Sequence, residues 1–199
     1  EPAAEEAPAI VEEPSRKDKK EVIRDKHKVR NLTREERELF GSYIQGKSMK
    51  EQLINAIDGI SMASYTGNVI VTGAEGMDSI GLAKNMVREV QMTDHNMTGK
   101  IAKISGDSLN SRNVKEIIDD LRNGALIIQK ASKMQESTAN DLYKALQKED
   151  FGIVVVMEDT KRMMDRFLQT NASLASCFTA RVDVAALSNQ ALAAFAKKY

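Results

Sequence analysis

One stretch of the chain, residues 68–80, has the outline of a phosphate-binding loop but not its chemistry. A short apolar run, Val69–Val71, leads through Thr72 and Gly73 into apolar residues at helical spacing. The same layout occurs in the P-loop, whose pattern is G-x-x-x-x-G-K-[ST] and whose lysine and hydroxyl contact phosphate and magnesium. Nucleotide binding is therefore the first chemistry to consider.

Neither register of the P-loop pattern supplies these reactive groups. Counted from Gly73, the second glycine falls on Asp78. The lysine position is then Ser79, and the hydroxyl position is Ile80. Counted from Gly76, the lysine position again holds an uncharged residue. A carboxylate at the start of the following helix also satisfies a helix N-terminus that would otherwise attract an anion. The stretch predicts a nucleotide-binding fold that has lost its nucleotide chemistry.

The bulk composition excludes several functional classes. The chain has 199 residues, and its 29 basic residues balance 29 acidic ones, so no global field points to nucleic acid. The single cysteine, Cys177, excludes an internal disulfide and a cysteine-rich zinc site and fits a reducing compartment. No apolar run approaches the roughly 20 residues that span a bilayer. We expect a cytoplasmic protein with no membrane contact, no metal and no cofactor.

The N-terminal segment differs in composition from the rest of the chain. Residues 1–31 are predicted to be a disordered or partly helical charged linker, because their composition cannot bury enough apolar area to offset chain entropy. The basic run Arg16–Arg30 is the candidate contact for nucleic acid, but it lacks interleaved aromatic residues that would stack on bases. We interpret this run as a solvated tether.

From residue 32 the pattern is typical of one α/β domain. Thr33 and Glu36 form a capping-box signature that opens a helix, and Ser48 is the predicted N-cap of a second helix. Strands then alternate with helices. The expected strands are 68–72, 100–104, 125–128, 152–157 and 180–184. The first helix between them is expected to end near residue 92. The later helices are expected at about 114–121, 138–148, 163–168 and 189–198.

Several of these strands are apolar throughout, as expected of parallel strands that are covered on both faces. The predicted fold is therefore a three-layer α/β/α sandwich with a five-stranded, mostly parallel sheet. The domain is expected to cover residues 32–187 and to include the N-terminal helices.

Four segments follow one another in a characteristic order: the P-loop-like stretch 69–76 and the segments 123–132, 153–168 and 171–178. Together they resemble the AAA+ ATPase module and most closely its CbxX/CfxQ-like (Rubisco-activase-like) group. In that group the second segment carries a Walker B strand of the form G-x-L-F-I-D-E-A, and the fourth reads N-P-G-L-R-S-R-F. The resemblance covers roughly residues 40–199 and implies the P-loop NTPase (AAA+-like) fold. It also implies that residues 188–199 start a truncated lid helix.

Departures from the family's pattern remove the catalytic groups that the resemblance implies. Gln129 and Lys130 replace the Walker B aspartate that holds magnesium and the glutamate that polarises water. Ala175 and Cys177 replace arginines that stabilise phosphate charge on a neighbouring subunit. Thr160, at the end of the sensor strand, keeps a hydroxyl. The resemblance thus implies a degenerate ATPase with no catalytic residues.

The nucleotide site is predicted to be vestigial. It would comprise ten residues, none expected to bind a cofactor: Gly73, Gly76, Asp78, Ser79, Ile80, Gln129, Lys130, Thr160, Ala175 and Cys177. We hypothesise that Lys130 pairs with Glu75 or Asp78 across this site, as an internal salt bridge where a nucleotide would sit.

We therefore expect a catalytically inactive AAA+-like domain that acts as a protein-interaction or scaffolding module. Its partner would be another protein, either an active AAA+ subunit or a protein that uses it as a passive platform. Two alternatives stay open. One is a nucleotide sensor that binds without hydrolysis through the backbone N–H groups of Gly73 and Gly76. The other is a nucleic-acid-associated factor that uses Arg16–Arg30.

Overall fold

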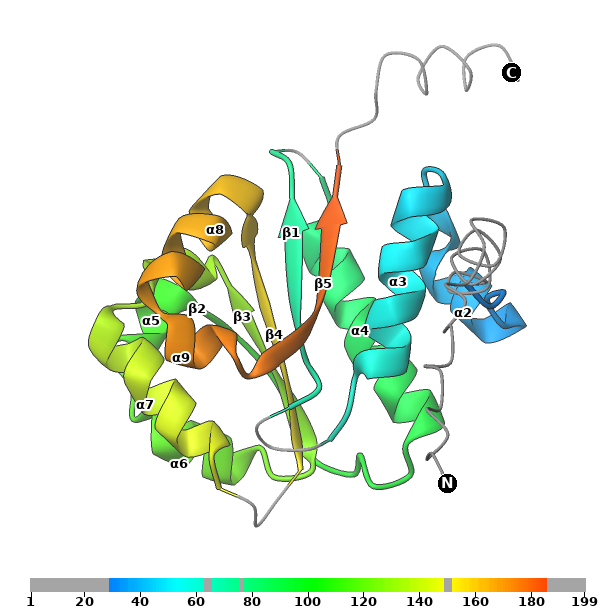
Figure 1. Ribbon diagram of the computed structural model, residues 1–199. Helices are drawn as coiled ribbons and strands as arrows, with labels where there is room; N and C mark the ends of the chain where they lie inside the picture. The colour runs from blue at the N-terminus through cyan, green and yellow to red at the C-terminus, as the bar shows by residue number, and fades with distance from the viewer. Residues whose placement is uncertain (1–28, 63–65, 76, 149–151, 186–199) are drawn as a thin grey trace, which may run out of the picture. The chain divides into compact units, whose positions relative to one another are not determined.

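A five-stranded sheet in which every neighbouring pair is parallel organises the domain (Figure 1). The computed structural model describes residues 29–62, 66–75, 77–148 and 152–185. The strand order is β2-β3-β4-β1-β5. The strands are β1 (Asn68–Gly73), β2 (Ile101–Ser105), β3 (Gly124–Gln129), β4 (Ile153–Thr160) and β5 (Phe178–Val184). Each predicted strand is present, with small shifts at its ends.

Helices connect the strands along the chain. They are α2 (Arg34–Phe40), α3 (Lys47–Gly59), α4 (Ser79–Thr93), α5 (Gly106–Leu109), α6 (Val114–Asp120), α7 (Glu136–Leu146), α8 (Lys161–Thr170) and α9 (Ala172–Ala175), with short 3₁₀ turns η2 (Gly41–Tyr43) and η3 (Ala131–Lys133). The predicted final helix, 189–198, lies outside the described residues, as does most of the predicted linker 1–31. The described residues from Leu32 onward belong to one compact unit.

Different helices bury the two faces of the sheet. On one face, Leu126, Val155 and Met157 join a core cluster with side chains of α6, α7 and α8. Successive side chains of a strand point to opposite faces, so Ile127 and Val154 lie on the other face, against which α4 packs. Since both faces are covered, the predicted three-layer α/β/α sandwich is confirmed.

The N-terminal helices confirm one predicted cap and contradict another. The capping box is present, because the Thr33 hydroxyl accepts a hydrogen bond from the backbone N–H of Glu36 and the Glu36 carboxylate accepts one from the N–H of Thr33. Ser48 is not the N-cap of α3. That position is Gly46, whose φ of 106° is readily adopted by glycine, so the helix already begins at Lys47.

The two edges of the sheet differ in their cover. Helix α3 lies beside the edge strand β5 (Figure 1), and the side-chain oxygen of Gln52 accepts a hydrogen bond from the backbone N–H of Asp183 at 2.9 Å. The opposite edge strand, β2, has no such cover among the described residues.

Asn68 joins three parts of the sheet through its side chain. The residue is 0% exposed and sits at a register shift at the start of β1. Its Oδ1 accepts a hydrogen bond from the N–H of Val155 at 2.8 Å, and its Nδ2 donates to the carbonyl of Cys177 at 3.1 Å. Both backbone groups are buried, so the amide provides hydrogen bonds that the irregular ladder leaves unmade.

We predict that Asn68→Ala lowers the free energy of unfolding by about 2–6 kcal/mol, because two buried backbone groups each lose a partner at about 1–3 kcal/mol. Urea denaturation would measure the change. Asn55→Ala is the matched control, since Asn55 is exposed on α3, and its effect should stay within about 0.5 kcal/mol. Equal effects of the two substitutions would contradict this role of Asn68.

Candidate functional site

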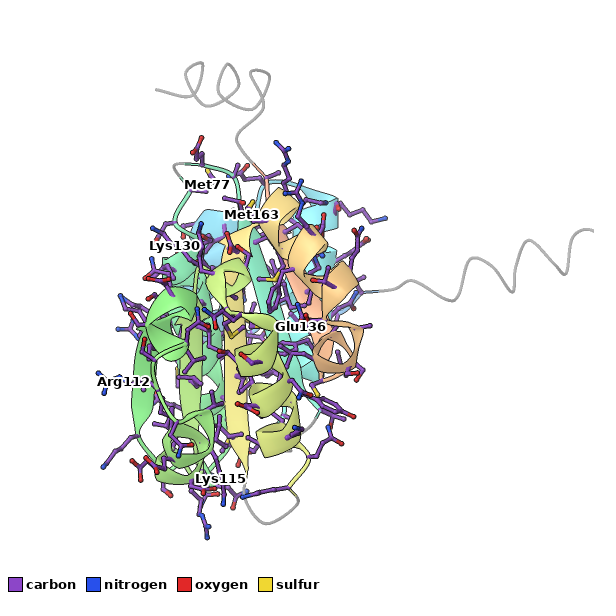
Figure 2. All side chains as sticks on the ribbon, turned by 90° about the vertical axis from the view of Figure 1, so that its left-hand side faces the viewer. Met77, Arg112, Lys115, Lys130, Glu136 and Met163 are labelled. Carbon is purple, nitrogen blue, oxygen red and sulfur yellow. The ribbon has the colours of Figure 1, made fainter. Side chains whose placement is uncertain are left out.

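The predicted site residues gather mainly at the carboxyl end of the sheet. Gly73 ends β1 and lies opposite Thr160, which ends β4. Gln129 ends β3 and lies opposite Glu158. Figure 2 shows Met77, from the β1–α4 loop, and Lys130 at this same end of the molecule. Ligands of open α/β sheets bind at this edge, so it is the place to look for chemistry.

The N-terminus of α4 is capped by a carboxylate of the chain itself. Asp78 accepts a hydrogen bond from the backbone N–H of Gly81 at 2.8 Å through Oδ1, and one from the Tyr43 hydroxyl at 3.2 Å through Oδ2. Burial, then the charge of Asp78 and the hydrogen bond to it, raises the pKa of Tyr43 to about 12. The helix terminus that would attract a phosphate therefore already has its anion.

A second carboxylate contacts the residue at the P-loop lysine position. The Ser79 hydroxyl donates a hydrogen bond to Oε1 of Glu158 at 2.5 Å. Both residues are buried, with 6% and 8% exposed. The backbone N–H of Lys130 points to the other oxygen of Glu158 at 3.4 Å. A negative group thus lies beside the start of α4, where a P-loop presents its lysine to phosphate.

The next residue, Asp159, holds the turn that follows β3. The residue is 7% exposed, and its carboxylate accepts hydrogen bonds from the backbone N–H groups of Ser132 at 2.9 Å and Thr160 at 2.7 Å. Lys130, in the same turn, has a φ of 50°, which is uncommon for a residue with a side chain. Glu158 and Asp159 therefore both stabilise the turn that carries Lys130.

The hypothesised ion pair of Lys130 is absent. No ion pair among the described residues joins Lys130 to Glu75 or Asp78. Asp78 instead accepts its hydrogen bonds from Gly81 and Tyr43, and the Lys130 side chain is exposed to solvent. Among the described residues, the contacts at the start of α4 are hydrogen bonds to the carboxylates of Asp78 and Glu158, without a salt bridge to Lys130.

Two predicted site residues lie away from this edge. The carbonyl of Cys177 accepts a hydrogen bond from Asn68, which begins β1, whereas Gly73 ends it. Cys177 is therefore at the opposite end of β1, close in sequence to Ala175 at the end of α9. Its thiol is buried, and burial raises its pKa.

The other predicted residues are placed as their sequence positions suggest. Ile80 is the second residue of α4 and is partly exposed, and Thr160 precedes α8 without a capping hydrogen bond from its side chain. Gly76 lies outside the described residues. Among the described residues no group of three or more histidine, cysteine or acidic side chains is arranged to hold a metal.

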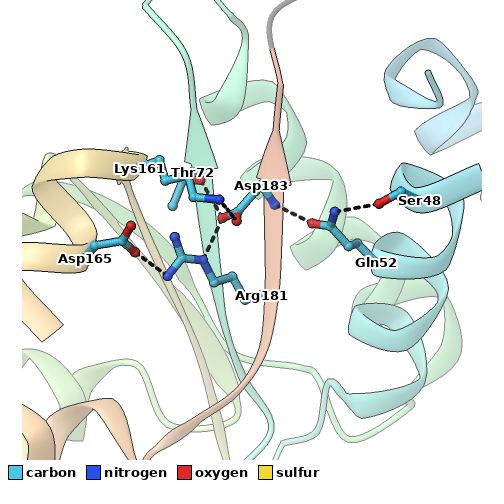
Figure 3. Close-up of polar contacts among 7 residues, drawn as sticks. All are labelled: Ser48, Gln52, Thr72, Lys161, Asp165, Arg181 and Asp183. Carbon is cyan, nitrogen blue, oxygen red and sulfur yellow. Dashed lines mark hydrogen bonds and ion pairs between the residues drawn. The ribbon is translucent and has the colours of Figure 1, made fainter. Parts of the chain in front are cut away.

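A second polar cluster, centred on Asp183, links β1, β5 and α8 (Figure 3). The Asp183 carboxylate accepts hydrogen bonds from Thr72 Oγ1 at 2.7 Å, Lys161 Nζ at 2.8 Å and Arg181 Nε at 2.6 Å. Burial alone would raise the pKa of Asp183, but these hydrogen bonds and the charge of Arg181 lower it below its ordinary 3.8.

Arg181 extends the cluster to a second acid. Its Nη1 pairs with Asp165 of α8 at 2.7 Å, so one guanidinium ties β5 to α8. Burial would lower the pKa of Arg181, but the hydrogen bonds to Asp183 and Asp165 raise it. Its Nη2 is buried and has no hydrogen-bond partner among the described residues. Asp183 and Asp165 balance the charges of Arg181 and Lys161. The cluster therefore has no net charge, and it connects β5 to α8.

The sequence analysis did not predict the hydrogen bonds of Glu158 or those of Asp183. The signal for Asp183 was the spacing of Arg181 and Asp183, two residues apart on one strand and hence on one face. The signal for Glu158 was an acid that directly continues a fully apolar run. Neither signal names the partner, because Ser79 lies 79 residues from Glu158 in the sequence.

Comparison with solved structures supports the fold that this geometry describes. A lysine-to-arginine mutant of Thermotoga maritima RuvB matches with a TM-score of 0.59 at 19% sequence identity, covering 80% of this chain and 52% of that one. A threonine-to-valine mutant of the same protein gives a TM-score of 0.60 at 18% identity, covering 80% of this chain and 51% of that one. The Thermotoga maritima RuvB Holliday junction branch migration motor gives 0.57 at 18% identity, with 79% and 51% covered.

The chain has the P-loop NTPase fold of the AAA+ type. At these identities the likeness shows the fold and not the activity, and the chain spans about half the length of the RuvB chains that it matches. Comparison with protein-family models gives no match, and comparison with curated proteins gives none either. The CbxX/CfxQ-like assignment stays a prediction. No helix among the described residues is long and apolar enough to cross a membrane.

We predict that Asp183 makes stability depend on pH in the acid range. Its folded-state pKa is lowered, so its contribution is complete at neutral pH and is lost as the pH falls below about 3.8 through the folded value. Wild type should therefore be more stable than Asp183→Asn at pH 7, and the difference should shrink as the pH falls toward 3. Urea denaturation of both proteins across this range would measure it, and a constant difference would contradict the role of Asp183.

Proposed function

We propose that this chain is a catalytically inactive AAA+-like domain that acts as a protein-interaction or scaffolding module. The observation that carries the proposal is the hydrogen bond between Ser79 and the buried Glu158 carboxylate at the start of α4. A nucleotide phosphate at this position would meet a negative charge in a buried setting, where repulsion between like charges is poorly screened.

Other features of the same edge support the proposal. Asp78 supplies the anion that the α4 terminus would otherwise seek from a ligand. Gln129 and Lys130, at the end of β3, offer neither a carboxylate for magnesium nor a base for water. Hydrolysis in P-loop enzymes depends on positioning and charge stabilisation by such groups, so their combined loss leaves no route to catalysis.

We propose a role in binding other proteins, because the fold is complete without the catalytic groups of an ATPase. Its core, its capped helices and its polar ties form a rigid platform, and function in such a domain would lie on its surface. The partner that we propose is another protein. Two kinds fit: an active AAA+ subunit that this domain would regulate, and a protein that uses the domain as a passive platform.

We predict that ATP or ADP with magnesium, each at millimolar concentration, leaves the melting temperature of this chain unchanged. A ligand at about one hundred times its dissociation constant would stabilise the fold by roughly 2.7 kcal/mol, a shift that thermal denaturation detects. Release of phosphate from ATP, measured in parallel, should not exceed the rate without protein.

Two methionine variants make a positive result interpretable. Met77 lies in the loop between β1 and α4, and Met92 is 52% exposed near the far end of α4. A rise in melting temperature with ATP that Met77→Glu abolishes and Met92→Glu retains would overturn the proposal in favour of a nucleotide sensor. Substitution of Gly73 is a poor probe, because a Cβ there would lie 2.8 Å from the Ser79 Cβ and disturb the fold.

A further inference from the structure

The exposed edge strand β2 offers main-chain hydrogen-bonding groups to solvent. The carbonyl of Lys100 accepts a hydrogen bond from Ala125 at 3.0 Å, and Ala102 lies opposite Leu126 in the parallel ladder. Because inward and outward backbone groups alternate along such a strand, Ile101 and Lys103 direct their N–H and C=O groups away from β3. Among the described residues, none donates to or accepts from these outward groups.

A groove runs along this edge, between β2 and the helices that follow it. It has a volume of about 510 Å³. Its apolar lining includes Ala102, Ile104 and Ile117, which are only partly buried and pack against the core cluster. Arg112 and Ser108 contribute polar groups to the lining. On the opposite face of the strand, Ile101 is 43% exposed. Both faces beside the edge thus offer apolar contact.

The charge around the edge is basic. Lys100, Lys103, Arg112 and Lys115 are exposed, and none forms an ion pair with another described residue. Between the first and last of them the one acid is Asp107, and Glu116, which is exposed, directly follows Lys115. Figure 2 shows Arg112 and Lys115 projecting from the surface of the molecule. A segment that lies along β2 would therefore be favoured if it carried carboxylates.

Lysine on an edge strand also protects a sheet against unwanted pairing, and Lys103 alone fits that role. Protection explains neither the groove with its apolar lining nor Arg112 beside it. The combination of free main-chain groups, apolar contact and positive charge is what strand addition uses, with alternate side chains of the added strand entering pockets.

We propose that the β2 edge binds an extended acidic segment of a partner protein by strand addition. The main chain of the segment would pair with Ile101 and Lys103. Apolar side chains on one face of the segment would enter the groove lined by Ala102 and Ile104, and carboxylates on its other face would meet Lys103. Arg112, beside the groove, would add positive charge that attracts the acidic segment as a whole. The proposal rests on the interaction role proposed above and names the surface that performs it.

A peptide of defined chemistry tests the proposal. The probe is a labelled peptide of about ten residues, the upper end of ordinary strand length, in which glutamate alternates with valine. Fluorescence anisotropy should show saturable binding to the full chain. A peptide with lysine in place of glutamate should bind at least about tenfold more weakly, since it reverses the charge complementarity. Hydrogen exchange should slow at the amides of Ile101 and Lys103 when the acidic peptide is bound.

Variants separate main-chain pairing from charge attraction. Lys103→Pro removes an outward N–H that the sheet itself does not use, and it should weaken binding about tenfold, as expected for the loss of a hydrogen bond and a charge. Arg112→Glu, which leaves the strand intact, should weaken binding as well. Lys84→Glu, on the exposed face of α4, is the matched control and should bind like wild type.

Three results would overturn the proposal: no binding of the acidic peptide, equal weakening by Lys84→Glu and Arg112→Glu, or exchange protection away from β2. Self-association of the chain that Lys103→Pro abolishes would assign the edge to a second copy instead. These measurements contain no nucleotide, so their failure is distinguishable from a failure of the inactive-site proposal.

Discussion

The buried carboxylate of Glu158 is the constraint on which the carboxyl edge of the sheet depends. A buried charge is costly unless hydrogen-bond donors surround it, and Glu158 finds them in the Ser79 hydroxyl and the backbone N–H of Lys130. These contacts join the start of α4 to the ends of β3 and β4. The chain's own side chains thus occupy hydrogen-bonding groups at the start of α4.

The sheet was predictable from the sequence because its strands are apolar runs separated by helices. A parallel connection needs such a crossover, so the parallel order follows from local signals. The prediction that Ser48 caps α3 was wrong, because Gly46 adopts a positive φ and the helix begins at Lys47. A sequence pattern does not report that angle. The pairings of Glu158 with Ser79 and of Asp183 with Thr72 were out of reach, since each joins residues far apart in sequence.

If the carboxyl edge does not bind nucleotide, as we propose, function would lie elsewhere on the surface. One side of the sheet is sealed by α3, which accepts the hydrogen bond from Asp183 through Gln52. The other edge, β2, keeps main-chain groups that no described residue uses, beside a groove and a basic surface. These features fit the proposed role of the domain in holding a partner.

The central claim is that the chain's own carboxylates close the start of α4 to nucleotide. The most direct measurement is a two-dimensional NMR titration of the isotope-labelled chain with ATP and magnesium, which follows the backbone amides of Ser79 and Gly81. We expect these two amide signals to stay in place up to millimolar ATP. Saturable shifts centred on them would contradict the claim and show that the site still accepts a phosphate.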